Sequence, residues 1–329
     1  MKIAVYSTQP YDKAYLQQHN TGHELLFYEA PLTIGTCSLA AGCTAICVFV
    51  NDGVHAAILA KLSSMGVKLI VLRCAGFNNV DAVAAKQLNI KIVRVPAYAP
   101  QAVAEHAVAL ILTLNRKTHK AYNRVREGNF SLTNLAGFNL HNKTAGVVGT
   151  GKIGSAFCKI MLGFGCKVLA YDVLEDDALK QAGVQYTTLN NLLLQSTIIS
   201  LHCPLNAATA HIINNDTLAL MQPGTMLINT SRGALINTAH AIAALKTGRL
   251  GYLGIDVYEQ EEALFFNDLT GTVVSDDIIE RLMSFTNVLI TPHQGFFTAE
   301  ALTEIAVTTF ANIDGFDKGA PLINEVVAV

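Results

Sequence analysis

The sequence predicts an α/β protein built from two domains, each with a parallel sheet. Short apolar, β-branched runs alternate with helix-like segments over most of the 329 residues. Hydrophobic residues make up 51% of the chain and charged residues only 15%, a balance that suits strands buried on both faces between helices. A chain of this length also exceeds the usual size of a single hydrophobic core, so we expect two domains.

The first domain is predicted from strand-like runs near the N-terminus. They are residues 2–6, 24–28, 45–50, 68–73 and 91–95. Their alternation with helical segments favours parallel β-α-β units. A final helix, from about residue 298 to residue 316, is expected to return to this layer. The first domain, which we expect to bind the substrate, would then be discontinuous and comprise residues 1–99 plus 299–329.

The second domain, residues 100–298, is predicted from a connecting helix over residues 101–126 and a second series of strands. The strand-like runs are residues 145–148, 166–171, 197–201, 225–229, 252–257 and 288–291. They predict a doubly wound sheet, in which the carboxyl ends of the strands line a ligand crevice. We therefore expect two Rossmann-like or flavodoxin-like parallel-sheet domains, with the active site in the cleft between them.

A glycine-rich run, Gly149-Thr150-Gly151-Lys152-Ile153-Gly154, joins the first strand of the second sheet to a helix-patterned stretch. This arrangement is typical of sites that bind the pyrophosphate of a dinucleotide at a helix N-terminus. The first glycine allows a tight turn, the second lets the backbone approach the phosphates, and the third permits close packing of helix on strand. Lys152 and Ile153 would begin that helix beside the phosphates.

Asp172 stands at the end of the next strand, where a carboxylate can accept hydrogen bonds from the hydroxyls of the adenine ribose. No Lys or Arg follows until Lys180, and Glu175, Asp176 and Asp177 would repel a 2′-phosphate. The sequence therefore predicts NAD rather than NADP as the cofactor.

Composition disfavours several other classes of protein. Lys and Arg number 23 against 25 Asp and Glu, so we expect no basic face and no nucleic-acid partner. No apolar run approaches the roughly 18 residues of a membrane span, and the first apolar segment is too short for a signal peptide. We expect a cytoplasmic protein with reduced thiols, because the cysteines are odd in number and lie mostly in apolar runs. No metal site is expected, since Cys43 and Cys47 have no neighbouring histidine.

Four segments together resemble the D-isomer-specific 2-hydroxyacid dehydrogenases. They are the glycine-rich run, Thr230-Ser231-Arg232-Gly233, the acidic segment 256–261 and Pro292-His293. The resemblance covers essentially the whole chain. Within that family, segments 73–79 and 95–98 and the insertion 262–283, with Phe265 and Phe266, are most similar to the bacterial fermentative D-lactate dehydrogenases.

Reduction of a 2-keto acid needs a proton for the carbonyl oxygen and a cation for the carboxylate. His293 is the candidate proton donor, because imidazole is the side chain whose charge changes near neutral pH. Arg232 is the candidate cation, because its planar guanidinium can bind both carboxylate oxygens and donate to the carbonyl oxygen. A neighbouring carboxylate would stabilise the imidazolium. The resemblance assigns that role to Glu261, whereas the residues alone leave Glu259 and Glu262 equally open.

The resemblance also implies how the rest of the two ligands is bound. The backbone N–H groups of Ala75 and Gly76 would bind the substrate carboxylate. Tyr98 and Phe296 would wall the pocket, so that the methyl group of pyruvate fits better than a larger group. The remaining cofactor contacts would come from turns after later strands, namely Cys203, Pro204, Thr230, Ser231, Arg232 and Asp256.

The leading hypothesis is NAD-dependent reduction of pyruvate to D-lactate. The alternative within the family is a bulkier or different keto acid, such as phenylpyruvate, 2-ketoisocaproate or hydroxypyruvate. A non-catalytic NAD-sensing regulator is disfavoured by the intact set of Arg232, Glu261 and His293, and a methyltransferase leaves the Thr-Ser-Arg-Gly and Pro-His turns unexplained. The expected partners are a small-molecule acid and further copies of the chain, as a homodimer or homotetramer. The apolar helix 101–114 is a candidate contact.

Overall fold

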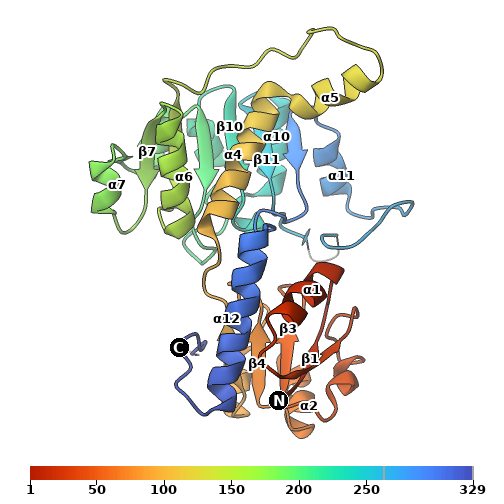
Figure 1. Ribbon diagram of the computed structural model, residues 1–329. Coiled ribbons are helices and arrows are strands. Elements are labelled where there is room, and N and C mark those ends of the chain that lie inside the picture. Colours follow the sequence, from red (N-terminus) through yellow and green to blue (C-terminus); the bar gives the residue numbers. More distant parts are fainter. Residues whose placement is uncertain (262–263, 328–329) are drawn as a thin grey trace. The chain divides into compact units, whose positions relative to one another are not determined.

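The computed structural model describes residues 1–261 and 264–327, which fold into two compact units (Figure 1). Unit 1 comprises Met1–Ala99 together with the segment that starts at Phe296, and unit 2 comprises Pro100–Gly295. Each unit is a parallel sheet covered by helices on both faces. None of the helices in the described ranges has the length and apolar character that crossing a membrane requires.

The sheet of unit 1 has the strand order β2-β1-β3-β4-β5, with all neighbours parallel. Its strands are β1 (Lys2–Val5), β2 (Glu24–Phe27), β3 (Ala45–Val48), β4 (Leu69–Leu72) and β5 (Lys91–Arg94). This is the flavodoxin-like order of a doubly wound fold. The five strand-like runs of the sequence are confirmed, and every residue of β3 and β4 is buried, as expected of central parallel strands.

Helices cover both faces of this sheet. On one face lie α1 (Pro10–Gln18) and the long final helix α12 (Ala299–Asp317), and on the other lie α2 (Ala56–Ser64), α3 (Ala82–Gln87) and the 3₁₀ helix η1 (Cys37–Ala40). The hydroxyl of Thr298 caps α12 by accepting from the N–H of Ala301 at 3.2 Å. Phe310 of α12 is 1% exposed and packs with Ile3 and Val71 of the sheet, so the end of the chain completes the core of unit 1.

The sheet of unit 2 has the order β12-β11-β10-β9-β6-β7-β8. Its strands are β6 (Thr144–Val148), β7 (Lys167–Tyr171), β8 (Gln185–Tyr186), β9 (Ile198–Leu201), β10 (Thr225–Asn229), β11 (Leu250–Ile255) and β12 (Val288–Ile290). This is the Rossmann order with one further strand. The six strands expected here are confirmed. The edge strand β8 was not expected, since two residues carry no recognisable pattern.

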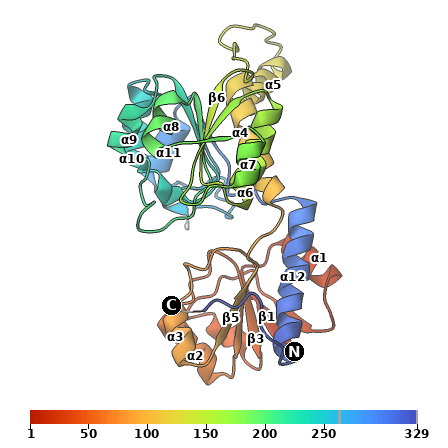
Figure 2. The same ribbon diagram turned by 90° about the vertical axis from the view of Figure 1, so that its left-hand side faces the viewer.

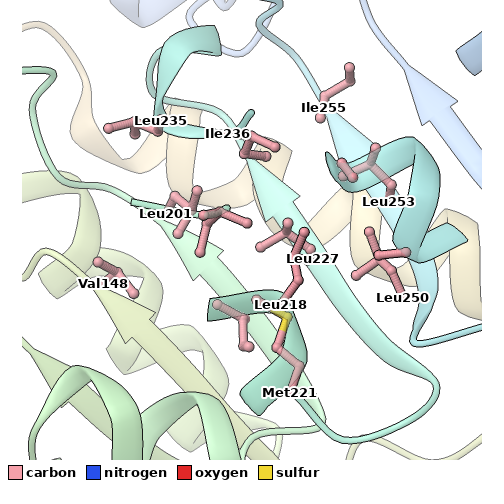
Figure 3. Close-up of a cluster of buried hydrophobic side chains, with 14 of the residues drawn as sticks. Val148, Leu201, Leu218, Met221, Leu227, Leu235, Ile236, Leu250, Leu253 and Ile255 are labelled. Carbon is pink, nitrogen blue, oxygen red and sulfur yellow. The ribbon is translucent and has the colours of Figure 1, made fainter. Parts of the chain in front are cut away.

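The two faces of the second sheet are covered by separate sets of helices (Figure 2). One set is α4 (Pro100–Arg116), α6 (Lys152–Gly163) and α7 (Asp177–Gln181), and the other is α8 (Leu189–Gln195), α9 (Asn215–Leu220), α10 (Thr238–Lys246) and α11 (Asp277–Met283). Figure 3 shows the core on the second face, where Leu201, Leu227 and Leu253 of three strands meet Leu218 of α9. Burying each such leucine stabilises the fold by roughly 1.5–3 kcal/mol.

The single helix predicted over residues 101–126 is wrong, because the structure has two helices there. α4 ends at Arg116, and α5 (Thr118–Arg126) starts after Lys117, whose φ of 51° is left-handed. The returning chain explains the break: Asn115 donates to the carbonyl of Phe138 at 2.7 Å and accepts its N–H at 2.8 Å. The apolar side chains of α4, including Leu110 and Ile111, lie in the core of unit 2 and are not an exposed contact surface.

Candidate active site

The predicted residues of unit 2 follow the carboxyl ends of neighbouring strands. The glycine-rich run comes after β6, Asp172 after β7, and Cys203 with Pro204 after β9. Thr230, Ser231 and Arg232 follow β10, Asp256 and Glu261 follow β11, and His293 follows β12. Carboxyl ends of parallel strands form one edge of the sheet, and ligands of doubly wound folds bind there.

The three glycines of the run have different surroundings. Gly149 has a φ of 94°, and a Cβ there would lie 2.5 Å from the backbone nitrogen of Cys203. A Cβ on Gly154 would lie 1.9 Å from the carbonyl oxygen of Gly149. A Cβ on Gly151 would meet nothing within 4 Å. The first and third glycines are therefore required by the protein itself, and the second leaves its backbone open to a ligand.

The same edge fits a dinucleotide. α6 starts at Lys152 without a side-chain cap, so its first N–H groups and the positive end of its dipole are available to a pyrophosphate. Ile153 of the same turn packs its side chain into the core behind the helix. The hydroxyl oxygen of Thr230 is buried and has no hydrogen-bond partner among the described residues, which is unusual unless a ligand supplies one.

Asp172 is held in its ionised form. Burial raises the pKa of this carboxyl, but hydrogen bonds from the N–H groups of Thr150 and Leu174 and from the Thr150 hydroxyl lower the pKa by more. The net effect is a pKa below the ordinary value of aspartate. An ionised carboxylate at this place can accept hydroxyl hydrogen bonds and repels a phosphate.

His293 and Glu261 form the central contact of the site. The imidazole Nδ1 of His293 lies 2.9 Å from Oε1 of Glu261, and Oε2 of Glu261 accepts the N–H of Tyr258 at 2.9 Å. Both side chains are mostly buried. Because a carboxylate only accepts, Nδ1 donates to Glu261, and Nε2 is the nitrogen left to exchange a proton with a substrate. Phe266 lies beside the imidazole, with ring centroids 5.8 Å apart.

Glu259 has different partners. Oε1 lies 2.7 Å from Nε2 of His211, and Oε2 accepts the hydroxyl and N–H of Thr238 at 2.5 and 2.9 Å. Burial raises the pKa of Glu259, but these bonds lower it by more, so it lies below the usual value of glutamate. Of the two described acids, Glu261 is therefore the one in contact with His293. Glu262, the third candidate, lies outside the described residues.

The turn that carries His293 is held by Asp256, which is 1% exposed. The carboxylate accepts the Thr291 hydroxyl at 2.5 Å and the N–H groups of Gln294 and Gly295 at 2.9 and 2.8 Å. His293 itself has a φ of 56°, a left-handed conformation that is costly for residues other than glycine. The network around Asp256 keeps the histidine in that conformation.

Helix α4 adds one further residue to this network. His106 Nε2 lies 3.2 Å from the Asp256 carboxylate and 3.0 Å from the Thr291 hydroxyl. The carboxylate of the predicted cofactor residue Asp256 thus bonds the turn after β12 and α4.

Arg232 is placed by the backbone around it. Asn229, at the end of β10, donates to the carbonyl of Arg232 at 2.9 Å, and Ser231 donates to the carbonyl of Cys203 at 2.8 Å. The next residue, Gly233, packs so closely on Tyr258 that a Cβ would lie 2.1 Å from its carbonyl carbon. Among the described residues, no carboxylate lies within ion-pair distance of the Arg232 guanidinium, which donates only to the Ser231 carbonyl at 2.7 Å.

The predicted residues of unit 1 form a group of their own. Tyr98 and Phe296 meet edge to face, with ring centroids 6.1 Å apart, and Phe49 lies 6.2 Å from Phe296. Arg94 donates to the carbonyl of Ala75 at 2.7 Å. The sequence did not single out Phe49, whose ring lies 5.0 Å from the buried guanidinium of Arg73.

Comparison with known proteins identifies the family. Residues 108–295 match the family model of the D-isomer specific 2-hydroxyacid dehydrogenase, NAD binding domain. The chain belongs to this family. Over 329 residues the dehydrogenase is 52% identical to the D-lactate dehydrogenase of Escherichia coli strain K12, with 99% of this chain and 100% of the relative covered.

Two solved structures have the same fold as the dehydrogenase. The apo structure of D-lactate dehydrogenase from Escherichia coli superposes with a TM-score of 0.92 at 50% identity, covering 99% of this chain and 100% of that one. D-lactate dehydrogenase from Aquifex aeolicus, complexed with NAD and lactic acid, gives a TM-score of 0.88 at 35% identity and covers 99% of both chains. The dehydrogenase is thus an NAD-dependent oxidoreductase of 2-hydroxy acids, as the sequence predicted.

Sequence reasoning missed the residues that support the site. His106, Asn229 and Thr291 contact candidate residues that are distant in sequence or hold them through the backbone. Asn229 and Thr291 end or follow predicted strands, which was a usable signal. His106 lies within a helix and carried no such signal.

Proposed function

We propose that the chain is an NAD-dependent D-lactate dehydrogenase that works mainly as a pyruvate reductase. The observation that carries the proposal is the contact of His293 with Glu261 at 2.9 Å, at the sheet edge where Arg232 also lies. NADH supplies the hydride when bound. Relatives that align over nearly the full chain are named D-lactate dehydrogenase and pyruvate reductase, and these names support pyruvate as the substrate.

In this proposal His293 is the proton donor. Its Nε2 gives a proton to the carbonyl oxygen while Nδ1 stays bonded to Glu261, whose negative charge stabilises the imidazolium before transfer. Arg232 binds the substrate carboxylate and donates to the carbonyl oxygen, where negative charge develops. The lack of a carboxylate partner for Arg232 among the described residues supports this role.

We propose that the domain formed by residues 100–298 binds NAD. The glycines and α6 would hold the pyrophosphate, and Asp172 the adenine ribose. The other cofactor residues would be Lys152, Ile153, Cys203, Pro204, Thr230, Ser231, Arg232 and Asp256, the last of them through the turn that its buried carboxylate holds. The uncapped start of α6 and the unpartnered Thr230 hydroxyl support this assignment.

The domain of residues 1–99 plus 299–329, together with the adjoining Phe296, would contribute the rest of the substrate site. The N–H groups of Ala75 and Gly76 find no acceptor among the described residues and can bind a carboxylate. Tyr98 and Phe296 would limit the room for the substrate side chain, in favour of a methyl group. Bulk at these positions is the physical basis for preferring pyruvate over phenylpyruvate.

We further propose a cytoplasmic homodimer or homotetramer whose ligands are small molecules. Exposed apolar side chains on α5 and the segment after it support self-association. They are Tyr122, Val125, Phe130 and Leu132, which are between 49% and 83% exposed. Such a group of large apolar side chains is unusual on a monomer.

Initial rates with NADH and a panel of keto acids, followed at 340 nm, test the proposal. Pyruvate should give the highest kcat/KM, and the product should be the D enantiomer of lactate. A higher kcat/KM for phenylpyruvate, 2-ketoisocaproate or hydroxypyruvate would assign the chain to a different substrate. NADH binding without turnover of any keto acid would leave only a sensing role.

A further inference from the structure

A chain of hydrogen bonds starts at Asp176, the N-cap residue of α7, and ends on Asp172. The N–H of Asp176 donates to the Tyr186 hydroxyl at 3.0 Å, and that hydroxyl donates to the Thr150 hydroxyl at 2.9 Å. The Thr150 hydroxyl in turn lies 3.1 Å from Oδ2 of Asp172. Four groups from the glycine-rich run, β8 and the loop after β7 are thereby joined.

The direction of every bond in this chain is fixed by chemistry. A backbone N–H can only donate, so the Tyr186 oxygen accepts from Asp176 and has one hydrogen left for Thr150. An ionised carboxylate can only accept, so the Thr150 hydroxyl must give its own hydrogen to Asp172. Bonds that all point the same way polarise one another, and the last one, to a charged group, is strengthened most.

This chain of hydrogen bonds limits how many further donors the Asp172 carboxylate can bind. A carboxylate offers about four acceptor positions. Oδ2 takes both the N–H and the hydroxyl of Thr150, at 2.5 and 3.1 Å, and Oδ1 takes the N–H of Leu174 at 3.2 Å. Since Oδ2 takes both bonds from Thr150, Oδ1 is the oxygen with more room for an incoming hydroxyl. The carboxylate is therefore held in one orientation by donors from the glycine-rich run and from the loop after β7.

The first cation after Asp172 in the sequence, Lys180, does not offset this negative charge for a phosphate. Lys180 lies 5.9 Å from the centre of the Tyr186 ring. Its ammonium is 2.8 Å from Glu175 and 2.9 Å from Asp177. Two carboxylates thus already share the first cation that follows Asp172 in the sequence.

We propose that Tyr186 is a positioning residue which, through Thr150, orients the Asp172 carboxylate toward a ribose 2′-hydroxyl and thereby sets the preference for NAD over NADP. This rests on the proposed binding of the adenine ribose by Asp172. Tyr186 touches neither the cofactor nor the reacting atoms in this scheme. Its hydroxyl acts by holding the hydrogen of Thr150 on Asp172.

The test is equilibrium titration with NADH and with NADPH, followed by the fluorescence of the nucleotide. Tyr186→Phe removes only the hydroxyl and should weaken NADH binding by about threefold to tenfold, the usual effect of losing one hydrogen bond in such a network. NADPH binding should change by less than twofold, so the ratio of the two dissociation constants falls. In steady state, KM for NADH should rise by a larger factor than kcat falls.

Two further variants make the result specific. Tyr252→Phe on β11 removes a hydroxyl that bonds no described residue, and should leave both affinities unchanged. Thr150→Val removes the hydroxyl that links Tyr186 to Asp172. Adding Tyr186→Phe to this variant should therefore have no further effect on NADH affinity. Thermal unfolding without nucleotide shows whether each variant is folded.

The outcomes separate this inference from the proposed function. If Asp172→Ala lowers the NADH preference but Tyr186→Phe does not, the positioning role is wrong and ribose recognition by Asp172 stands. The inference would also be overturned if Tyr186→Phe weakened NADH binding equally in the unmodified protein and in the Thr150→Val variant. If Asp172→Ala leaves the preference unchanged, the proposed ribose site itself is wrong.

Discussion

The imidazole Nδ1 of His293 lies 2.9 Å from Oε1 of Glu261, although the two residues are separated by an insertion and belong to turns after different strands. The other oxygen of Glu261 is fixed by the N–H of Tyr258. The acid therefore cannot turn away from the histidine without losing a second hydrogen bond. This pair makes the proposed proton transfer open to direct tests.

Glu261→Gln should move the pH optimum of pyruvate reduction to lower pH. The amide carries no negative charge, so the protonated form of the imidazole loses the electrostatic stabilisation that the carboxylate provides. Glu259→Gln is the matched control, because Glu259 bonds His211 and Thr238 instead. Profiles of kcat/KM for pyruvate against pH measure both. If the pH profile shifts with Glu259→Gln and not with Glu261→Gln, the stabilising acid is Glu259 and the role proposed for Glu261 is wrong.

His293→Ala should lower kcat by about a hundredfold or more, the usual scale for loss of a general acid. NADH affinity, measured by titration, should fall far less than turnover. His240→Ala on α10 serves as the control, since its ring only accepts the N–H of Asn215. Near-normal turnover of the His293 variant would refute its role as the proton donor.

Arg232→Lys should lower kcat/KM for pyruvate by about a hundredfold, because an ammonium cannot bond two carboxylate oxygens and the carbonyl in one plane. Because lysine keeps the positive charge, a loss of kcat/KM this large would show that the planar geometry of the guanidinium is needed as well as its charge. Saturation kinetics with pyruvate measure the effect. An unchanged kcat/KM would be incompatible with the proposed clamp.

The glycines of the glycine-rich run should respond differently to alanine. Gly154→Ala places a Cβ against the Gly149 carbonyl and should destabilise the free protein by about 1–3 kcal/mol. The Cβ of Gly151→Ala meets nothing within 4 Å, so this variant should keep the unfolding temperature of the unmodified protein. It should nevertheless bind NADH weakly, because the Cβ would stand where the phosphates approach the backbone. Gly163→Ala, also in open space on α6, controls for helix propensity. Normal NADH affinity of the Gly151 variant would place the pyrophosphate elsewhere.

Acid should remove the stabilisation that Glu259 provides. Its pKa in the folded protein is lowered, so the contribution is complete above the ordinary glutamate value of about 4.3 and is lost as the pH falls through the lower folded value. Thermal unfolding of the protein and of Glu259→Gln should therefore differ at pH 7 and converge toward pH 3. A constant difference across that range would contradict the linkage.

The strands and the glycine-rich run could be predicted because their signals are local. Apolar runs bounded by turns located both sheets, and each glycine of the run has the surroundings that its position in the motif required. The break at Lys117 could not be predicted, since it depends on Asn115 pairing with a segment that returns about twenty residues later.

The contacts that support the site could not be predicted from the sequence either. Glu259 and Glu261 lie in one irregular turn, where no periodicity says which way each side chain points. Their partners, His211 and His293, come from distant segments. The same holds for Tyr186, whose two-residue strand has no pattern of its own yet brings its hydroxyl to Thr150.

The left-handed backbone of His293 has a consequence for how this sequence can change. A glycine would adopt that conformation without strain, so replacing the proposed proton donor by glycine would relieve backbone strain at this position. Selection for a more robust fold and selection for turnover thus act in opposite directions at this one position. The buried carboxylate of Asp256 stabilises the turn through the N–H groups of Gln294 and Gly295, and this stabilisation offsets the strain of the left-handed histidine.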